Sequence, residues 1–284
     1  MKKIYLKFIL FTFVASFYCI ISDAQLVIKG HVTSDDGKPI EFVTVWMQAD
    51  SVGTISDANG DFTLQLSKPC KGNIELTHVA YNRTILPYIE WSNKKFFTVT
   101  MRERSVKLPE ICVPKKNRAK LISGDGMRGP GVIQFVHKSG KDNNELLEVG
   151  QIFKVHKNYI LSAFNFEVMA STIDETILNI NFYELEDGKL TNILTKPIYY
   201  KLYKSSQKTF VSITPDEEIR FNQGHKYWVS LRAVKASNSG AISFSTRICS
   251  NLIRVINTGK KKHFPGGLGF NVYGTVVNIK NIEH

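Results

Sequence analysis

Short segments in which apolar and polar residues alternate are the feature of this sequence that most constrains its fold. Residues 61–66 are an example, because Phe62, Leu64 and Leu66 alternate with polar residues. Successive side chains of a β-strand point to opposite faces of the sheet, so such a segment can bury one face and expose the other. Turn-forming residues separate the segments at close spacing, as in antiparallel β-sandwiches. The sequence therefore predicts an all-β protein.

The predicted strands fall into two groups, and a chain of 284 residues is long enough for two domains with separate cores. Residues 102–130, which lie between the groups, are rich in charged residues, glycine and proline, as linkers often are. The second group includes predicted strands at residues 159–170 and 175–185 and is typical of a jelly-roll-like sandwich. The expected order is a signal peptide at 1–24, a β-sandwich at 25–101, a linker at 102–130 and a second β-sandwich at 131–284.

The first residues of the chain predict a secretory signal peptide. A basic start with three lysines is followed by an apolar run at residues 8–21 and by the small-x-small sequence Ser22-Asp23-Ala24. The apolar run is short for a membrane span. We therefore expect cleavage after Ala24, no transmembrane span in the mature chain, and a location in the periplasm, at the outer membrane or outside the cell.

The spacing of Asp57, Asn59 and Asp61 matches the first three ligands of a calcium loop. An EF-hand loop also needs a glycine at its sixth position and a glutamate at its twelfth. Counted from Asp57, Gly60 is fourth and the twelfth residue is Lys68. A hairpin turn fits better, because Gly60 can adopt a positive φ and the Asx side chains can cap the backbone. The sequence predicts a hairpin here, and no metal ligand.

Other motifs that could carry chemistry are incomplete. Residues 124–129 (GDGMRG) match G-x-G-x-x-G, but a strand-like segment follows where a nucleotide-binding loop needs a helix. There is no H-E-x-x-H, and residues 236–240 (ASNSG) lack the first glycine of G-x-S-x-G. An odd number of cysteines after signal removal, without C-x-x-C, indicates neither a disulfide framework nor a zinc site; these are Cys70, Cys112 and Cys249. We assign no catalytic residue, metal or cofactor.

The net charge of +12 at pH 7 could favour anionic partners. The basic residues are scattered, however, apart from short runs at residues 115–116 and 260–262. No arginine–aromatic repeat typical of a nucleic-acid groove is present. We interpret the charge mainly as solvated surface and expect no nucleic-acid partner.

Aromatic residues in the second half are the candidates for a ligand surface. Tyr203, Tyr227 and Trp228, together with Tyr199 and Tyr200, could form a platform that stacks on sugars. The alternative is that they pack in the core or in cross-strand pairs. Alternation places Tyr227 and Trp228 on opposite faces of one strand, so at least one should face outward or into a cleft. The candidate ligand-binding residues are Tyr203, Tyr227 and Trp228.

A series of positions in residues 26–101 has the order found in a known family. They are Gly30-x-Val32, Gly37-Lys38-Pro39-Ile40, Val43-x-Val45, Gly53-Thr54-x-x-Asp57-x-x-Gly60-x-Phe62-x-Leu64 and Val79-Ala80-Tyr81. The segment resembles the carboxypeptidase regulatory-like domain, also called the peptidase-associated domain, although Ala80 stands where the family usually has glycine. The resemblance implies a transthyretin-like β-sandwich without peptidase chemistry, in an exported protein of Bacteroides-type bacteria.

Together these features predict a non-catalytic binding or assembly protein of the bacterial cell envelope, linked to glycan uptake or to an outer-membrane receptor. A glycan or an outer-membrane or other envelope protein is the expected partner. The alternative is a secreted hydrolase whose site assembles from dispersed acids and histidines of the second sandwich, because fold alone does not decide function.

Overall fold

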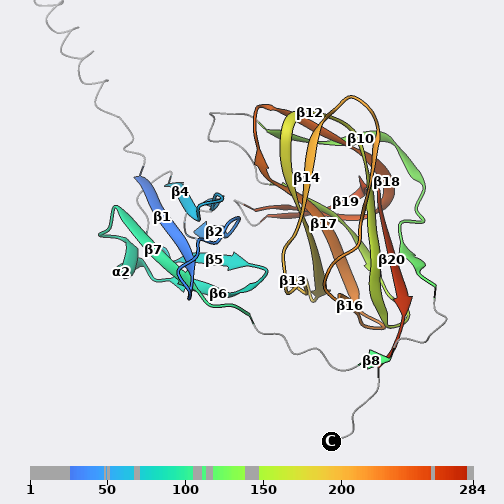
Figure 1. Ribbon diagram of the computed structural model, residues 1–284, viewed down its shortest axis with the longest axis horizontal. Helices are drawn as coiled ribbons and strands as arrows, with labels where there is room; N and C mark the ends of the chain where they lie inside the picture. Colours follow the sequence, from blue (N-terminus) through green and yellow to red (C-terminus); the bar gives the residue numbers. More distant parts are fainter. Residues whose placement is uncertain are drawn as a thin grey trace, which may run out of the picture.

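The computed structural model describes residues 26–47, 49, 52–66, 71–104, 111–112, 118–137, 147–256 and 260–279. Strands form two bodies, one from each half of the chain, and the all-β prediction of β-sandwich type is confirmed (Figure 1). The single helix in these ranges is the short α2 (Tyr88–Trp91). None of the helical segments in the described ranges is long and apolar enough to cross a membrane. The predicted signal peptide lies outside the described residues, as does Cys70.

The first sandwich is built from a sheet of three strands and a sheet of four. The three-stranded sheet has the order β4 (Asp61–Leu66), β1 (Leu26–Ser34) and β7 (Phe96–Met101). The four-stranded sheet has the order β3 (Val52–Ile55), β2 (Thr44–Met47), β5 (Ile74–His78) and β6 (Tyr81–Leu86). The alternation predicted for residues 61–66 is confirmed, because Phe62, Leu64 and Leu66 are buried and the residues between them are exposed.

The segment Asp57–Gly60 forms a turn, as predicted, but the flanking strands do not form a hairpin. β3 pairs with β2, whereas β4 pairs with β1, so the turn leads from one sheet to the other. Asp57 Oδ1 accepts hydrogen bonds from the backbone N–H groups of Asn59 (2.9 Å) and Asp61 (3.0 Å). Gly60 has a φ of +79°. The hairpin prediction was wrong because alternation defines the face of a strand but not its partner.

The second sandwich is one continuous sheet of twelve strands that folds over itself. Its central path is β10 (Arg128–His137), β18 (Gly240–Val255), β11 (Leu147–Lys154), β17 (Lys226–Ala236), β12 (Tyr159–Glu186), β20 (Phe270–Val276) and β9 (Lys120–Ser123). Strands β13 (Lys189–Asn192), β14 (Ile198–Ser205), β15 (Thr209–Ile213) and β16 (Arg220–Phe221) pair with β12, and β19 (Lys261–Leu268) pairs with β18.

The long strand β12 explains how one sheet becomes two layers. The sequence predicts separate strands at 159–170 and 175–185, but the structure has a single strand of 28 residues with a pairing irregularity between Ser171 and Glu175. The ring centroids of Phe164 and Phe182, both on β12, are 5.7 Å apart. In a straight strand they would be about 60 Å apart. The strand therefore bends back, and its two halves face each other across the core (Figure 1).

The linker prediction at 102–130 was too long. β9 and the start of β10 lie within it and belong to the large sheet, so the second sandwich begins before residue 131. In addition, the short strand β8 (Ile111–Cys112) pairs with β21 (Asn278–Ile279) near the end of the chain. Residues that look like a linker by composition can still supply strands when their backbone pairs with a distant segment.

Candidate functional site

A cleft of about 640 Å³ lies between the two sandwiches. This volume is in the range of small-molecule binding sites. Strands β2, β5 and β6 line it on the first sandwich, and β12, β13, β17 and β18 line it on the second. The lining side chains include Trp46, His78, Arg104, Asn181, Tyr183 and Arg232.

The floor of the cleft is the outer face of the large sheet. On β12, Leu178, Ile180 and Phe182 belong to the hydrophobic core. The residues between them, Asn179 and Asn181, therefore lie on the opposite face, where they line the cleft. Outward-facing positions of an exposed strand commonly carry charged residues, but here they carry asparagine. This substitution is the feature of the local sequence that marks this face.

Strand register brings charged residues from distant parts of the chain into one row. Glu148 on β11 is opposite both Arg254 on β18 and Arg232 on β17. Arg232 is in turn opposite Asn179 on β12, and Asn179 is opposite Tyr199 on β14. A carboxylate thus lies between two arginines across neighbouring strands, an arrangement in which cross-strand pairs attract.

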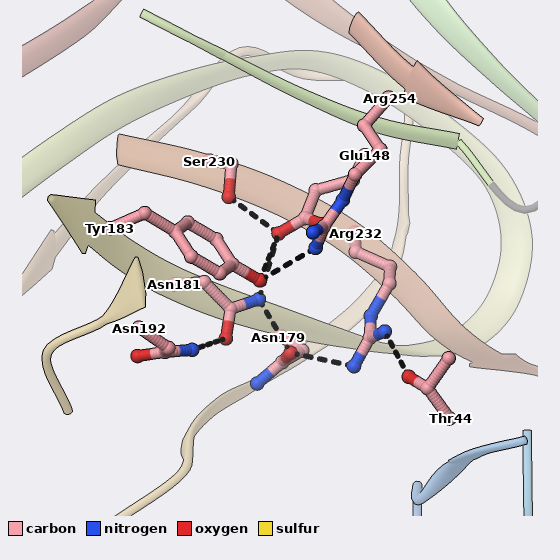
Figure 2. Close-up of polar contacts among 9 residues, drawn as sticks. All are labelled: Thr44, Glu148, Asn179, Asn181, Tyr183, Asn192, Ser230, Arg232 and Arg254. Atoms are coloured by element: carbon pink, nitrogen blue, oxygen red, sulfur yellow. Dashed lines mark hydrogen bonds and ion pairs between the residues drawn. The ribbon is translucent and has the colours of Figure 1, made fainter. Parts of the chain in front are cut away.

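Glu148 is fully buried, and both of its carboxylate oxygens are occupied (Figure 2). Oε1 accepts hydrogen bonds from Tyr183 Oη (3.1 Å), Asn181 Nδ2 (3.1 Å) and Ser230 Oγ (2.6 Å). Oε2 accepts hydrogen bonds from Nε (3.0 Å) and Nη2 of Arg254. A carboxylate can remain charged away from water only when it is paired and hydrogen-bonded in this way.

Electrostatics keep Glu148 ionised. Burial opposes the charged form, but Arg254 and Arg232, together with the Ser230 hydroxyl, outweigh it and hold the pKa of this carboxyl below its usual range. Burial also raises the pKa of Tyr183 to about 12, so its hydroxyl stays protonated and donates to Glu148. Glu148 is therefore an anionic anchor with no free lone pair directed at the cleft.

A chain of side-chain amides continues from this anchor along the floor. Asn181 donates to Asn179 Oδ1 (2.8 Å), and Asn192 on β13 donates to Asn181 Oδ1 (3.2 Å) (Figure 2). Arg232 donates from Nη2 to the same Asn179 oxygen (3.0 Å) and from Nη1 to Thr44 Oγ1 (2.9 Å) on the first sandwich. The amides are thus held in fixed orientations, and one hydrogen bond ties the floor to the opposite wall.

Aromatic rings support the arginine at the end of the row. The Arg254 guanidinium lies 4.9 Å from the ring centroid of Tyr183 and 5.5 Å from that of Trp228. Those two rings stack on each other with centroids 5.1 Å apart. Cation–π contacts of this kind favour Arg254 in its half-buried position.

The three aromatic residues selected from the sequence are not brought together. Tyr227 is 1% exposed and packs in the core, Trp228 is 0% exposed beneath Tyr183, and Tyr203 is 59% exposed on β14. Tyr227 and Trp228 do point to opposite faces, as alternation predicts, but the outer face is covered at Trp228. Neither ring offers a stacking surface, because burial depends on what packs above a strand.

Further contacts hold the first sandwich against the cleft. Arg104, which follows β7, donates from Nη1 to the backbone oxygen of Asn192 (3.3 Å) and from Nη2 to that of Leu194. The rings of Phe42 and Tyr199 meet edge to face with centroids 5.0 Å apart. Phe42 has a positive φ of 58°, which is rare for a bulky residue and places strain at this contact.

His78 is a titratable group in the lining of the cleft. Burial and the nearby charge of Arg232 lower the pKa of His78 to about 4. Its Nδ1 atom accepts a hydrogen bond from the backbone N–H of Ala80 (3.2 Å), which requires the neutral ring. At neutral pH the ring is uncharged.

Solved structures resemble the chain only weakly. The clostridial cysteine protease Cwp84 after propeptide cleavage has 8% identity and a TM-score of 0.37, with 83% of this chain and 66% of that one covered. A CocE/NonD family hydrolase from Staphylococcus aureus has 12% identity and a TM-score of 0.32, with 62% and 39% covered. A candidate carbohydrate-binding protein from Bacteroides uniformis has 11% identity and a TM-score of 0.24, with 89% and 98% covered. This chain spans less than two thirds of the length of the first two of these proteins. Similarity this low supports no argument about function.

A family model gives a clearer result. No curated protein matches the chain. Residues 28–113 match the model of the CarboxypepD_reg-like domain, which confirms the resemblance seen in the sequence and extends it past residue 101. These residues include every strand of the first sandwich after the start of β1. The first sandwich of this protein is therefore a CarboxypepD_reg-like domain.

Proposed function

We propose that this protein binds a glycan in the cleft between its two sandwiches and does not catalyse its conversion. The lining of the cleft carries the proposal, because it combines amides, guanidinium groups and aromatic rings. A saccharide presents hydroxyl groups that pair with amides and guanidinium groups, and apolar ring faces that pack against aromatic side chains. Binding sites commonly combine a few well-placed polar groups with such a preformed surface.

The state of Glu148 supports binding rather than catalysis. A general base or nucleophile must reach the substrate with a free lone pair. The carboxylate of Glu148 instead accepts hydrogen bonds from four residues, which are Asn181, Tyr183, Ser230 and Arg254. Its role in the proposed function is to hold Asn181 and Tyr183 in orientations that a ligand can use.

The proposed setting is the bacterial cell envelope, in a Bacteroides-type bacterium. The signal-peptide pattern at residues 1–24 supports export, and the CarboxypepD_reg-like domain supports an accessory rather than a catalytic role for the first sandwich. An outer-membrane protein is the second partner class. Mass spectrometry of the mature protein should give an N-terminus at Gln25, and a chain that begins at Met1 in the envelope would contradict export.

Trp46 provides a direct test of the cleft. It alternates with the buried residues Val45 and Met47, so its ring lies on the outer face of β2 and lines the cleft. Trp46→Ala should weaken the binding of a glycan selected on an array by about tenfold, as expected for one lost aromatic contact. Tyr203→Ala, which removes an exposed ring outside the cleft, is the matched control.

Isothermal titration measures the affinity of both variants for the glycan, and their melting temperatures verify that they are folded. The proposal fails if Trp46→Ala binds as well as the control, or if no glycan on the array binds. Shortening of the glycan during incubation, followed by mass spectrometry, would favour the secreted hydrolase.

A further inference from the structure

The arginines that line the cleft differ in how their charge is balanced. Arg254 is paired with Glu148, and Arg83 is paired with Glu75 at 2.6 Å. Each of these guanidinium groups has a carboxylate of its own, so little of its charge is left for a ligand.

Arg232 and Arg104 have neutral acceptors instead. Arg232 donates to the Thr44 hydroxyl and the Asn179 amide, and Arg104 donates to two backbone carbonyl groups. Within the described part of the chain, no ion pair is formed by either residue. Glu148 lies opposite Arg232 on the neighbouring strand and attracts it, but the Glu148 oxygens are taken up by Arg254 and by neutral donors. Arg232 and Arg104 are therefore cationic groups of the cleft without an ion-pair partner.

Both guanidinium groups are also short of hydrogen-bond acceptors. The Nε–H groups of Arg232 and Arg104 are buried, and neither donates to any residue in the described ranges. Arg232 is only 7% exposed, so water compensates it poorly. A buried charged group with an unused donor is uncommon in a folded protein and calls for an explanation. A ligand that brings negative charge into the cleft supplies one.

The remaining charges of the cleft add to the same field. Its cationic lining residues are Arg83, Arg104, Lys189, Arg232 and Arg254, against a single lining carboxylate, Glu75. His78 beside Arg232 is neutral, as its lowered pKa requires. A cleft lined mainly by one sign of charge between low-dielectric walls concentrates the potential and attracts ligands of the opposite sign.

The positions of the two arginines without ion-pair partners suit a saccharide. Arg104 contacts the backbone of Asn192, whose side chain begins the amide chain through Asn181 to Asn179, and Arg232 contacts the far end of that chain. Hydroxyl-binding amides thus lie between two cationic groups. Guanidinium groups are well suited to carboxylate and sulfate oxygens because they present parallel N–H donors.

We propose that the glycan held in the cleft is acidic, and that its carboxylate or sulfate groups compensate the charges of Arg232 and Arg104. The inference rests on the proposed glycan-binding function and specifies its ligand class. A neutral glycan would leave both guanidinium groups without an ion-pair partner.

The test compares acidic and neutral saccharides of equal length by isothermal titration of the full mature chain. Oligogalacturonate is paired with its carboxyl-reduced product, and a sulfated oligosaccharide is paired with its desulfated product, so that the arms separate carboxylate from sulfate. In at least one pair the acidic member should bind about tenfold more tightly, and added salt should reduce this difference.

Arg104→Gln is the informative variant, because glutamine can still donate to the backbone carbonyl groups that Arg104 contacts. It should remove most of the preference for the acidic member, because the affinity for that member falls much more than the affinity for the neutral one. The control is Arg118→Gln, which removes the same charge from an exposed position outside the cleft.

Three outcomes overturn the inference in distinguishable ways. Equal affinity for acidic and neutral members, with both reduced by Trp46→Ala, leaves glycan binding in place and rejects the acidic ligand. If Arg104→Gln and Arg118→Gln reduce the preference for the acidic saccharide equally, that preference comes from the overall charge of the protein rather than from the cleft. Absence of binding to every saccharide, with capture of an outer-membrane protein instead, rejects both proposals.

Discussion

Glu148 is a charged side chain that the fold removes completely from water. Its five hydrogen bonds come from four residues on three other strands, β12, β17 and β18. Such an arrangement orients every donor that it uses, and it becomes costly if one partner is lost. The geometry of the cleft floor therefore depends on this one residue.

Glu148→Gln should lower the free energy of unfolding by about 3 kcal/mol, because it leaves Arg254 without its ion-pair partner and removes the buried negative charge that attracts Arg232. The measurement is urea denaturation at pH 7. Glu167→Gln is the matched control, since Glu167 also contacts two cations, Arg128 and Lys208, but at the surface. The free energy of unfolding of this control should fall by less than about 1 kcal/mol. Equal losses would mean that Glu148 does not act as an anchor.

His78 should make the protein less stable in mild acid. Its pKa in the folded state, about 4, is below the value of 6.5 for the unfolded chain. The unfolded state therefore binds more protons between these two values, and stability falls as pH decreases from about 6.5 to about 4, by about 2–3 kcal/mol in total.

The variant His78→Asn isolates this contribution, because the Asn side-chain oxygen can accept the hydrogen bond from Ala80 but does not titrate. Urea unfolding from pH 7 to pH 4 should show a smaller loss for the variant than for the unchanged protein. Glu148 contributes at lower pH in both, because its pKa is below the usual range. Parallel stability curves for the two proteins would contradict the prediction.

Turns and long strands decide how the elements of this protein connect. The turn at Asp57–Gly60 carries the chain between the two sheets of the first sandwich, and β12 carries it between the two layers of the second. In both places the local sequence is ordinary. At Gly60, however, the close approach of β1 leaves no room for a side chain, since an added Cβ would lie 2.5 Å from the backbone oxygen of Val32.

Gly60→Ala should therefore lower the free energy of unfolding by more than the same substitution at a glycine that has a positive φ but no close neighbour. Gly37 provides the matched control, because its φ of +78° is nearly the same and an added Cβ would meet nothing within 4 Å. We expect a loss of about 1 kcal/mol for Gly37→Ala and about 2 kcal/mol or more for Gly60→Ala, measured by thermal or urea unfolding. Equal losses would show that β1 can move away from the turn.

The two sandwiches have separate hydrophobic cores but share contacts at the cleft. Arg232 with Thr44, Arg104 with Asn192, and the ring pair Phe42–Tyr199 connect them. Val79 of the first sandwich also packs against the core of the second. The cleft exists only while these contacts hold, so binding and domain docking are linked in the proposed function.

A double-mutant cycle on Phe42 and Tyr199 should measure this docking. Phe42→Leu and Tyr199→Leu each remove the edge-to-face contact, and their combination should cost less than the sum of the two, with a coupling energy of about 0.5–1.5 kcal/mol. The quantity is obtained from urea unfolding of the four proteins. A coupling energy of zero, with two separate unfolding transitions, would show that the sandwiches behave independently.

Local sequence was enough to predict the faces of the strands, the turn at Asp57–Gly60 and the family of the first sandwich. These depend on local order, because alternation and turn chemistry act over a few residues. The pairing of the strands, the bend of β12 into both layers and the burial of Trp228 became visible only in the folded chain. It also assembled the cleft, where Glu148 meets Arg254 across 106 positions of sequence. Such contacts follow from strand register and domain docking, which no short segment specifies.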